Sequence, residues 1–171
     1  LMSTFANTAP ARLATRLTFF AAGFAMACCA PLFPFIKQNV GADERQFGLL
    51  LLCFGLGSIV AMPLAGLVAA RRGPRSTMLL GGFGLIVFMP TLAMAQSLFT
   101  LAVMLFIFGA ALGTIDVAMN LHGAELEGQE KRSLMSSFHA QFSIGGLCGA
   151  GLITLLLSIG MPLIITAFIG A

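Results

Sequence analysis

The sequence predicts an all-α integral membrane protein, and its composition and charge distribution support this fold class. Of the 171 residues, 58% are hydrophobic and 9% are charged, and the mean hydropathy is +1.00. Soluble domains carry about 25% charged residues, so a water-soluble globular enzyme is excluded. The nine basic and six acidic residues leave four uncharged runs, over residues 17–36, 46–70, 76–115 and 133–171. Because a spanning helix needs about 20 apolar residues, these runs can hold up to six spans.

Charge, proline and glycine positions divide the chain into a tail and a membrane bundle. The tail covers residues 1–13 and the bundle residues 14–171, with spans at about residues 14–36, 46–70, 76–95, 98–121, 134–158 and 161–171. At about 1.5 Å per residue, the sixth span reaches only half way across a hydrocarbon core of about 30 Å. We therefore interpret the sequence as the amino-terminal portion of a longer chain, with the missing carboxyl-terminal half as its partner.

The first span imitates a secretory signal, because Arg12 and Arg16 precede an apolar stretch that is followed by Ala25-Met26-Ala27. A signal's apolar region is about 7–15 residues long, whereas this run continues through Pro31 and Pro34. We favour a retained first helix whose outer end is bent by the two prolines, or simply ends there.

Basic residues are distributed asymmetrically between the two ends of the predicted spans. If the amino terminus is cytoplasmic, the inner segments hold seven basic residues and the outer ones two, Lys37 and Arg45. This positive-inside bias predicts a cytoplasmic amino terminus. It also accounts for the net charge of +3 without a nucleic-acid partner. The seven inner residues are Arg12, Arg16, Arg71, Arg72, Arg75, Lys131 and Arg132.

The turn between the second and third spans is short and carries three arginines. Gly73 and Pro74 allow a tight reversal, so the two helices must be antiparallel neighbours. Cations are favoured at a helix carboxyl terminus. One interpretation is therefore a positive loop that only sets the topology.

The same turn resembles the G-x-x-x-D-R-x-G-R-R loop of the major facilitator superfamily through Gly66, Arg71, Gly73 and Arg75. In that family the loop lies between the second and third helices and latches the cytoplasmic gate. Here Ala70 replaces the family's acidic residue, and Pro74 replaces the first basic residue after the glycine. The resemblance therefore implies a cytoplasmic gating loop with this turn, but not the family's charge relay.

The fourth span ends in a stripe of small and polar residues. They are spaced four, three, four and three, which places them on one face of a helix: Gly109, Gly113, Asp116, Asn120 and Gly123. Small residues on a membrane helix permit close backbone approach. We therefore predict that the stripe faces protein or a cavity, with Gly109 and Gly113 in helix packing.

The fifth span carries a matching face, made of Ser136, His139, Ser143 and the packing residue Gly146. Asp116 and His139 each lie six residues from the loop that joins the two spans, or roughly 9 Å into their helices. Equal depth on consecutive antiparallel helices predicts a contact between them. One turn nearer the cytoplasm, Asn120 and Ser136 are predicted to pair.

Ionisable groups inside a bilayer are costly and mark functional sites. We assign Asp116, Asn120, His139 and Ser143 to a transport path or to proton coupling. Asp116 and His139 are hypothesised to share a proton, because burial and a neighbouring charge both change the proton affinity of such groups. Two alternatives remain open: the pair only locks two helices together, or it takes part in gating.

The polar stretch over residues 122–132 is predicted to be a solvated loop. His122 and Glu125 could bind a metal only as two ligands, which falls short of the usual protein set at zinc, and the cysteines show no C-x-x-C spacing. No metal, cofactor or nucleotide-binding loop is predicted.

Spans four and five resemble two segments of one bacterial branch of the major facilitator superfamily, the permeases similar to fucose permease. The segment D/E-x-x-x-N-x-x-G-x-x-x-E matches at Asp116, Asn120, Gly123 and Glu127, and H-x-x-x-S-x-G matches at His139, Ser143 and Gly145. The resemblance implies the six-span amino-terminal half of a twelve-helix fold. In this fold each half consists of inverted three-span repeats, and the protein works by alternating access in the bacterial inner membrane.

The function predicted first is secondary active transport of a small organic solute, with a sugar as one candidate and a proton gradient as the energy source. A non-transporting helical scaffold or sensor is the alternative. An intramembrane serine protease is less favoured, because the G-x-S-G signature is absent around Ser58 and Ser143. The protein is therefore not expected to be an enzyme, and its partners are a small solute and membrane lipid.

Overall fold

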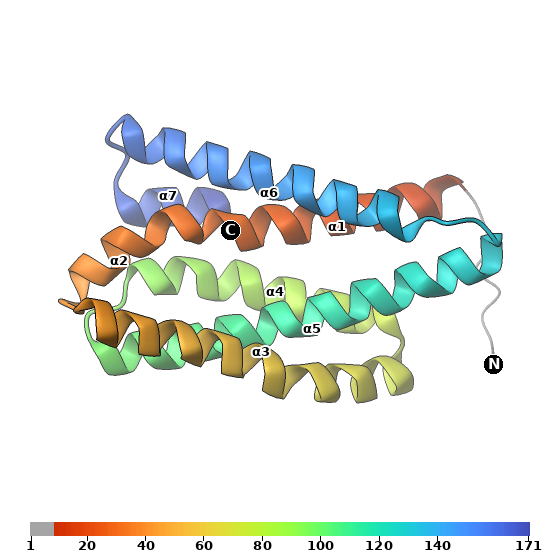
Figure 1. Cartoon of the computed structure of the whole chain (residues 1–171), viewed down its shortest axis with the longest axis horizontal. Helices are drawn as coiled ribbons and strands as arrows, with labels where there is room; N and C mark the ends of the chain where they lie inside the picture. The colour runs from red at the N-terminus through yellow and green to blue at the C-terminus, as the bar shows by residue number, and fades with distance from the viewer. Residues whose placement is uncertain (1–8) are drawn as a thin grey trace.

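The computed structural model describes residues 9–171, and every regular element in this range is a helix (Figure 1). Five segments are long and apolar enough to cross a membrane, namely Ala9–Asn39, Glu44–Arg72, Pro74–Ala93, Leu98–Glu130 and Met135–Ser158. The prediction of an all-helical membrane protein is thereby confirmed. Of the predicted tail, residues 1–8 lie outside the described residues. The elements are α1 (Ala9–Cys28), the 3-10 helix η1 (Ala30–Leu32), α2 (Phe33–Asn39), α3 (Glu44–Arg72), α4 (Pro74–Ala93), α5 (Leu98–Glu130), α6 (Met135–Ser158) and α7 (Leu163–Gly170).

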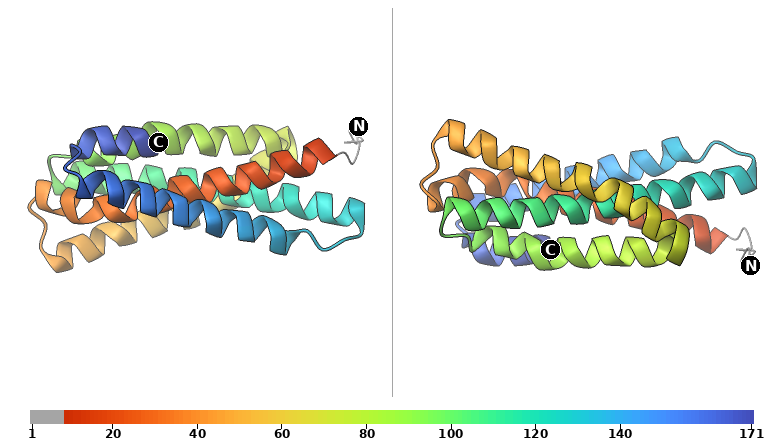
Figure 2. Two further views of the ribbon diagram at one scale, coloured as in Figure 1. Left: turned by 90° about the horizontal axis from the view of Figure 1, so that it is seen from above. Right: turned by 90° about the horizontal axis from the view of Figure 1, so that it is seen from below.

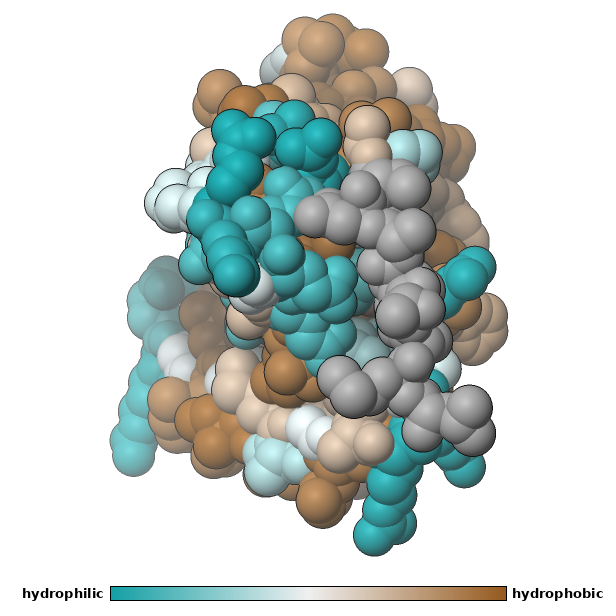
Figure 3. Space-filling view, turned by 90° about the vertical axis from the view of Figure 1, so that its right-hand side faces the viewer, coloured by the Kyte–Doolittle hydropathy of each residue, from teal (hydrophilic) through white to brown (hydrophobic). Residues whose placement is uncertain are grey.

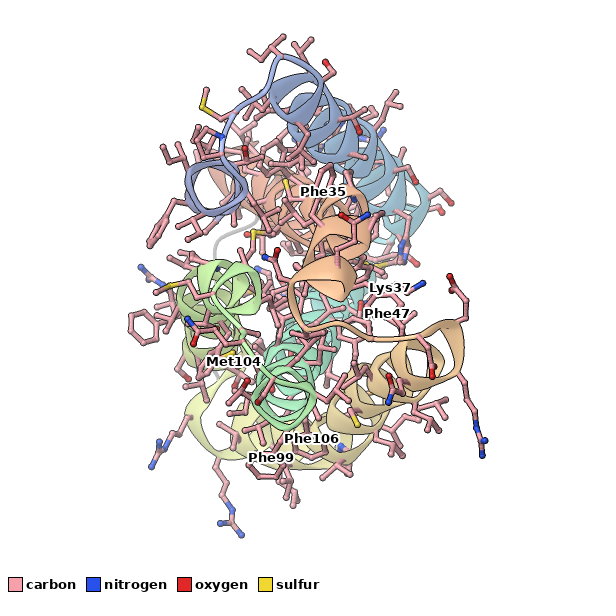
Figure 4. All side chains as sticks on the ribbon, turned by 90° about the vertical axis from the view of Figure 1, so that its left-hand side faces the viewer. Phe35, Lys37, Phe47, Phe99, Met104 and Phe106 are labelled. Atoms are coloured by element: carbon pink, nitrogen blue, oxygen red, sulfur yellow. The ribbon has the colours of Figure 1, made fainter. Side chains whose placement is uncertain are left out.

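The first span is interrupted at its two prolines. Proline lacks the N–H group that continues a helix, and Pro31 and Pro34 occupy the first turns of η1 and α2. The 3-10 turn therefore joins two separate helices. The short α2 is held against the start of α3, where Phe33 packs edge-on against Phe47 with ring centroids 5.9 Å apart. Lys37 forms an ion pair with Glu44 at the same end of the molecule (Figure 4).

The expectation of a loop over residues 122–132 is wrong, because α5 continues to Glu130. Glu, Gln, Leu and Ala, which fill much of this stretch, are good helix formers, and Leu126 is buried. The connection to α6 therefore begins only at Lys131, which has a positive φ of 51°. The carboxylate of Glu127 accepts hydrogen bonds from the backbone N–H groups of Leu134 and Met135, at 2.6 and 2.8 Å, and so caps the start of α6.

A single residue, Gly73, separates α3 from α4. Its φ of 85° and ψ of 154° lie in a region that only glycine occupies readily. Pro74 then starts α4, where the missing N–H group is tolerated. The Ser76 hydroxyl donates to the carbonyl oxygens of Arg72 and Gly73, at 2.8 and 3.0 Å. The reversal is tight, and both adjoining helix ends are capped locally.

Most of the helices form two groups that lie side by side (Figure 1). Helices α1 and α6 make one group and helices α3, α4 and α5 the other, with α1 packed along α6 and α5 packed along both α3 and α4. Helix α7 contacts both groups and lies beside α4 (Figure 2). Although α5 and α6 are consecutive, they contact each other little, and α5 makes more contact with α1. The order along the chain is therefore not the order of packing.

Helices α1, α3, α5 and α6 each carry the motif F-x-x-G-x-x-x-G/A, which joins them into two parallel pairs. A side-chain carbon added at the glycine of one helix would overlap the backbone carbonyl oxygen of the phenylalanine on its partner, and the overlap is reciprocal in both pairs. Such close approach is the reason for small residues at membrane helix contacts. The motif residues are Phe20, Gly23 and Ala27 with Phe142, Gly145 and Gly149 in the α1–α6 pair, and Phe54, Gly57 and Ala61 with Phe106, Gly109 and Gly113 in the α3–α5 pair.

Basic residues gather at one end of the molecule, which we call the basic end. It holds the start of α1, the α3–α4 turn and the α5–α6 turn (Figure 1), and hydrophilic side chains cover much of it (Figure 3). All seven residues that define the positive-inside pattern belong to these segments. At the opposite end, Lys37 and Arg45 flank the α2–α3 connection.

Candidate functional site

The polar stripe of α5 changes partner along its length. At Gly109 and Gly113 it packs against α3, opposite Phe54 and Ser58. At Gly123 it packs against α6, where a side-chain carbon would lie 2.9 Å from Met135 Sδ and 3.2 Å from the Phe138 ring. Asp116 lies between these two contacts, at the point where α3 gives way to α6. The stripe therefore faces protein at both ends, with α3 at one end and α6 at the other.

Asp116 and Asn120 form a pair within α5. The Asn120 side-chain amide donates to the backbone carbonyl of Asp116 at 2.9 Å and to its Oδ1 at 3.2 Å. Both residues are half-buried. Among the described residues, the other carboxylate oxygen of Asp116 makes no hydrogen bond. The carboxylate is thus held by its own helix through one of its two oxygens.

His139 is exposed on α6 and makes an aromatic contact with α1. Its ring meets that of Phe19 edge-on, with centroids 5.5 Å apart and an interplanar angle of 82°. Within residues 9–171, no hydrogen bond or ion pair joins His139 to the Asp116 carboxylate. The predicted contact between the two groups is therefore not a direct bond, because α5 and α6 contact each other little beyond their shared turn.

The remaining predicted path residues bond within their own helices or face outward. The Ser143 hydroxyl donates to the backbone carbonyl of His139 at 3.1 Å, and Ser143 is exposed. Ser136 is exposed as well, and in the described part of the chain it makes no hydrogen bond to Asn120. Gly146 lies on the α1 side of α6, where a side-chain carbon would be 3.6 Å from Ala27 Cβ.

The residues of the predicted gating loop are separated by the helix end. Gly66 is inside α3 with open space around its Cα, and Gly73 forms the turn. Arg71 and Arg75 are exposed, as is Ala70 at the family's acidic position. Neither arginine is in an ion pair with any acidic residue that the structure describes.

Two carboxylates that the sequence interpretation assigns to a loop join three helices at the basic end. Glu127 caps α6, as described above. Glu130, whose side chain is only 5% exposed, pairs with Arg12 of α1 at 3.4 Å. Its Oε1 is buried and has no hydrogen-bond partner among the described residues. Arg12 and Glu130 are 118 positions apart, and no spacing rule in the sequence could have paired them.

One cavity in the bundle is almost entirely apolar, and Asp116 is not among its lining residues. It has a volume of about 370 Å³ and lies between α1, α4 and α5, with Leu17, Ala21, Leu85, Ile86 and Ile115 among its lining residues. Ala171, at the end of α7, also lines it. A cavity without charged groups offers no means of holding a polar solute, so the candidate site is the Asp116 region.

The fold and this site define the class of the protein. Five apolar spans make it an integral membrane protein, and a half-buried carboxylate lies at a helix junction within the bundle. The chain belongs to the Major Facilitator Superfamily, whose family model matches residues 17–171. This finding confirms the superfamily that the α3–α4 turn and the α5 stripe indicate from sequence.

Relatives of the chain include bacterial membrane proteins of greater length. An uncharacterised MFS-type transporter of Yersinia pestis is 46% identical over 150 residues, which cover 88% of this chain and 39% of the relative. An uncharacterised transporter of Sinorhizobium fredii is 32% identical over 132 residues (77% and 35%), and the membrane protein MosC of Rhizobium meliloti is 28% identical over 136 residues (80% and 33%). The chain thus spans less than two fifths of the curated relatives it matches. No solved structure matches it significantly.

Proposed function

We propose that this chain is the amino-terminal six-helix half of a secondary active transporter in the bacterial inner membrane. Its basic end faces the cytoplasm, and it moves a small organic solute by alternating access. The observation that carries the proposal is the Asp116–Asn120 pair, which lies where the packing partner of α5 changes from α3 to α6. An intramembrane carboxylate is costly and is retained where a proton, ion or solute uses it.

The paired F-x-x-G motifs support an inverted repeat within this half. The first span contains α1 and the fourth is α5, while the second is α3 and the fifth is α6. If the first is exchanged with the fourth and the second with the fifth, the α1–α6 pair becomes the α5–α3 pair. Both pairs have the same reciprocal contacts between glycine and phenylalanine carbonyl. Two three-span repeats of opposite orientation give this relation, which is the architecture of this transporter class.

Asp116 and His139 are proposed to carry the coupling proton, while Asn120 and Ser143 contact the solute. Asn120 holds one oxygen of Asp116 and leaves the other accessible. Asp116 takes its hydrogen bonds from its own helix, so a role limited to locking α5 to α6 has little support. A neutral hexose fits this set of amide, hydroxyl and imidazole groups, and the resemblance to fucose permease makes L-fucose the first probe.

Proteoliposomes that contain the full-length protein and a lumenal pH dye test this proposal. Addition of L-fucose is expected to acidify the lumen with the wild-type protein, and Asp116→Asn and His139→Gln should each abolish the signal. Thr114→Val is the matched control, because the Thr114 hydroxyl already donates to the Ala110 carbonyl of its own helix at 2.7 Å. Uptake of labelled L-fucose without acidification would refute proton coupling, and the absence of uptake would refute L-fucose as substrate.

The α3–α4 turn is proposed to act in cytoplasmic gating through its shape and its free arginines. Arg71 and Arg75 are exposed at the basic end and are available to another part of the transporter. Ala70 removes the acidic partner that the family's loop carries, so this gate would depend on cations and the glycine turn alone. Arg71→Gln combined with Arg75→Gln should change the rate of L-fucose uptake in the same proteoliposomes.

A further inference from the structure

Phe19 links the aromatic core of the α1–α6 pair to the imidazole of His139. The Phe19 ring is completely buried. It stacks on the Phe138 ring, with centroids 5.4 Å apart and an interplanar angle of 27°, and it meets His139 edge-on at 5.5 Å. Phe138 is also completely buried. A ring fixed by stacking against a buried neighbour thus contacts the one exposed ring of the candidate site.

The contact matters because His139 has no other fixed partner among the described side chains. An exposed side chain samples several rotamers, and each rotamer would place the imidazole nitrogens differently with respect to Asp116. Aromatic rings prefer edge-to-face over face-to-face contact, so a fixed Phe19 ring favours the rotamer that meets it edge-on. The helix separation is fixed one turn away, where Gly23 and Gly145 approach the partner backbone.

We propose that Phe19 is a positioning residue for His139, holding the imidazole in one orientation through the edge-to-face contact of the two rings. This inference rests on the proposed function, in which His139 and Asp116 carry the proton. Phe19 itself is buried and touches neither proton nor solute. Its role is to make the geometry of the α6 imidazole depend on the packing of α1.

Nuclear magnetic resonance of the full-length protein with carbon-13-labelled histidine tests the positioning directly. A nearby aromatic ring shifts the resonance of the imidazole Cε1–H group, and His139→Gln identifies which signal belongs to His139. Phe19→Met keeps an apolar side chain but removes the ring, and we expect it to move the His139 signal by more than its linewidth. Phe19→Tyr keeps the ring and should leave the signal close to its wild-type position.

Phe108→Met is the matched control. Phe108 is as buried as Phe19 and stacks on Phe54 with centroids 5.9 Å apart, but it belongs to the α3–α5 pair and contacts no imidazole. It should leave the His139 signal in place. If Phe19→Met does not fold, Phe138→Met removes the stacking that fixes Phe19 and should shift the His139 signal in the same sense.

The inference is overturned if the His139 signal is the same in Phe19→Met, or in Phe138→Met, as in the wild type. An equal shift in Phe108→Met would also overturn it, because the effect would then be general loosening of the bundle. These outcomes need no transport measurement. Failure of the proposed function appears separately, as lumenal acidification that survives both Asp116→Asn and His139→Gln.

Discussion

The α1–α6 pair and the α3–α5 pair meet through the same contacts between glycine and phenylalanine carbonyl, but the helices within them differ between these contacts and the basic end. In α3, residues 59–70 are all apolar or glycine. In α5 and α6 the corresponding stretches hold Asp116, Asn120 and His139. The contacts that hold each pair together involve backbone atoms and glycine, so the polar residues are not needed for pairing. This separation of polar residues from the pairing contacts supports the proposal that they act in transport.

The largest expected effect compares the buried phenylalanines of the two pairs. Phe19→Ala and Phe108→Ala each leave a cavity in a packed interior, and such changes cost about 3–5 kcal/mol in cores. We expect values near the lower end, because lipid tails are as apolar as the interior. Thermal unfolding of the purified full-length variants should show similar losses in both pairs. A large loss in one pair only would mean that the shared motif does not give shared stability.

Phe83→Ala is the control for this comparison. Phe83 of α4 is 67% exposed on the described part of the chain, so its truncation leaves no internal cavity. Its unfolding temperature should stay close to that of the wild type.

The next effect concerns the glycines at the helix contacts. Gly57→Val and Gly145→Val each place side-chain atoms where a partner carbonyl oxygen lies, and overpacking typically costs about 1–3 kcal/mol. Backbone cannot move aside as a flexible side chain can, so we expect the upper end of this range. Gly55→Val and Gly151→Val are matched controls in the same two helices, because a Cβ at either position meets nothing within 4 Å. Equal losses in test and control variants would contradict the close approach of the pairs.

A smaller effect on stability is expected at two glycines towards the basic end of α3. Alanine should destabilise the protein at one of them and stabilise it at the other. Gly73→Ala forces alanine into a backbone conformation that costs about 1–3 kcal/mol for residues other than glycine, so unfolding should occur at lower temperature. Gly66→Ala lies in the interior of α3 with open space around it, and alanine stabilises a helix by about 0.5–1 kcal/mol relative to glycine. A destabilising Gly66→Ala would show that Gly66 is in contact with another part of the transporter.

Sequence reasoning reached the fold class and the superfamily but not the partners of the site residues. Long uncharged runs indicate segments that lie in lipid, and basic turns indicate segments that lie in water, so the membrane class follows from composition. Helical phase places Asp116 and Gly123 on one face, but it does not say which helix covers that face, and the structure has α3 at one end and α6 at the other. The contact of Phe19 with His139 depends on packing between spans distant in sequence. The end of α5 was misassigned because residues 122–130 combine high charge with high helix propensity, and charge alone suggests a loop.

The smallest expected effect concerns the α5–α6 turn. This turn is stabilised by the Glu127 side chain, whereas the α3–α4 turn contains a glycine. Glu127 accepts hydrogen bonds from the Leu134 and Met135 N–H groups, two of the donors that a helix start leaves without partners. Glu127→Ala should therefore speed amide hydrogen exchange at these two residues without changing exchange in the middle of α6. Glu125→Ala is the matched control, since Glu125 is exposed on the same helix and caps no N–H group in the structure. Unchanged exchange in Glu127→Ala would mean that the Glu127 carboxylate does not protect these N–H groups and that the turn is held by its other contacts.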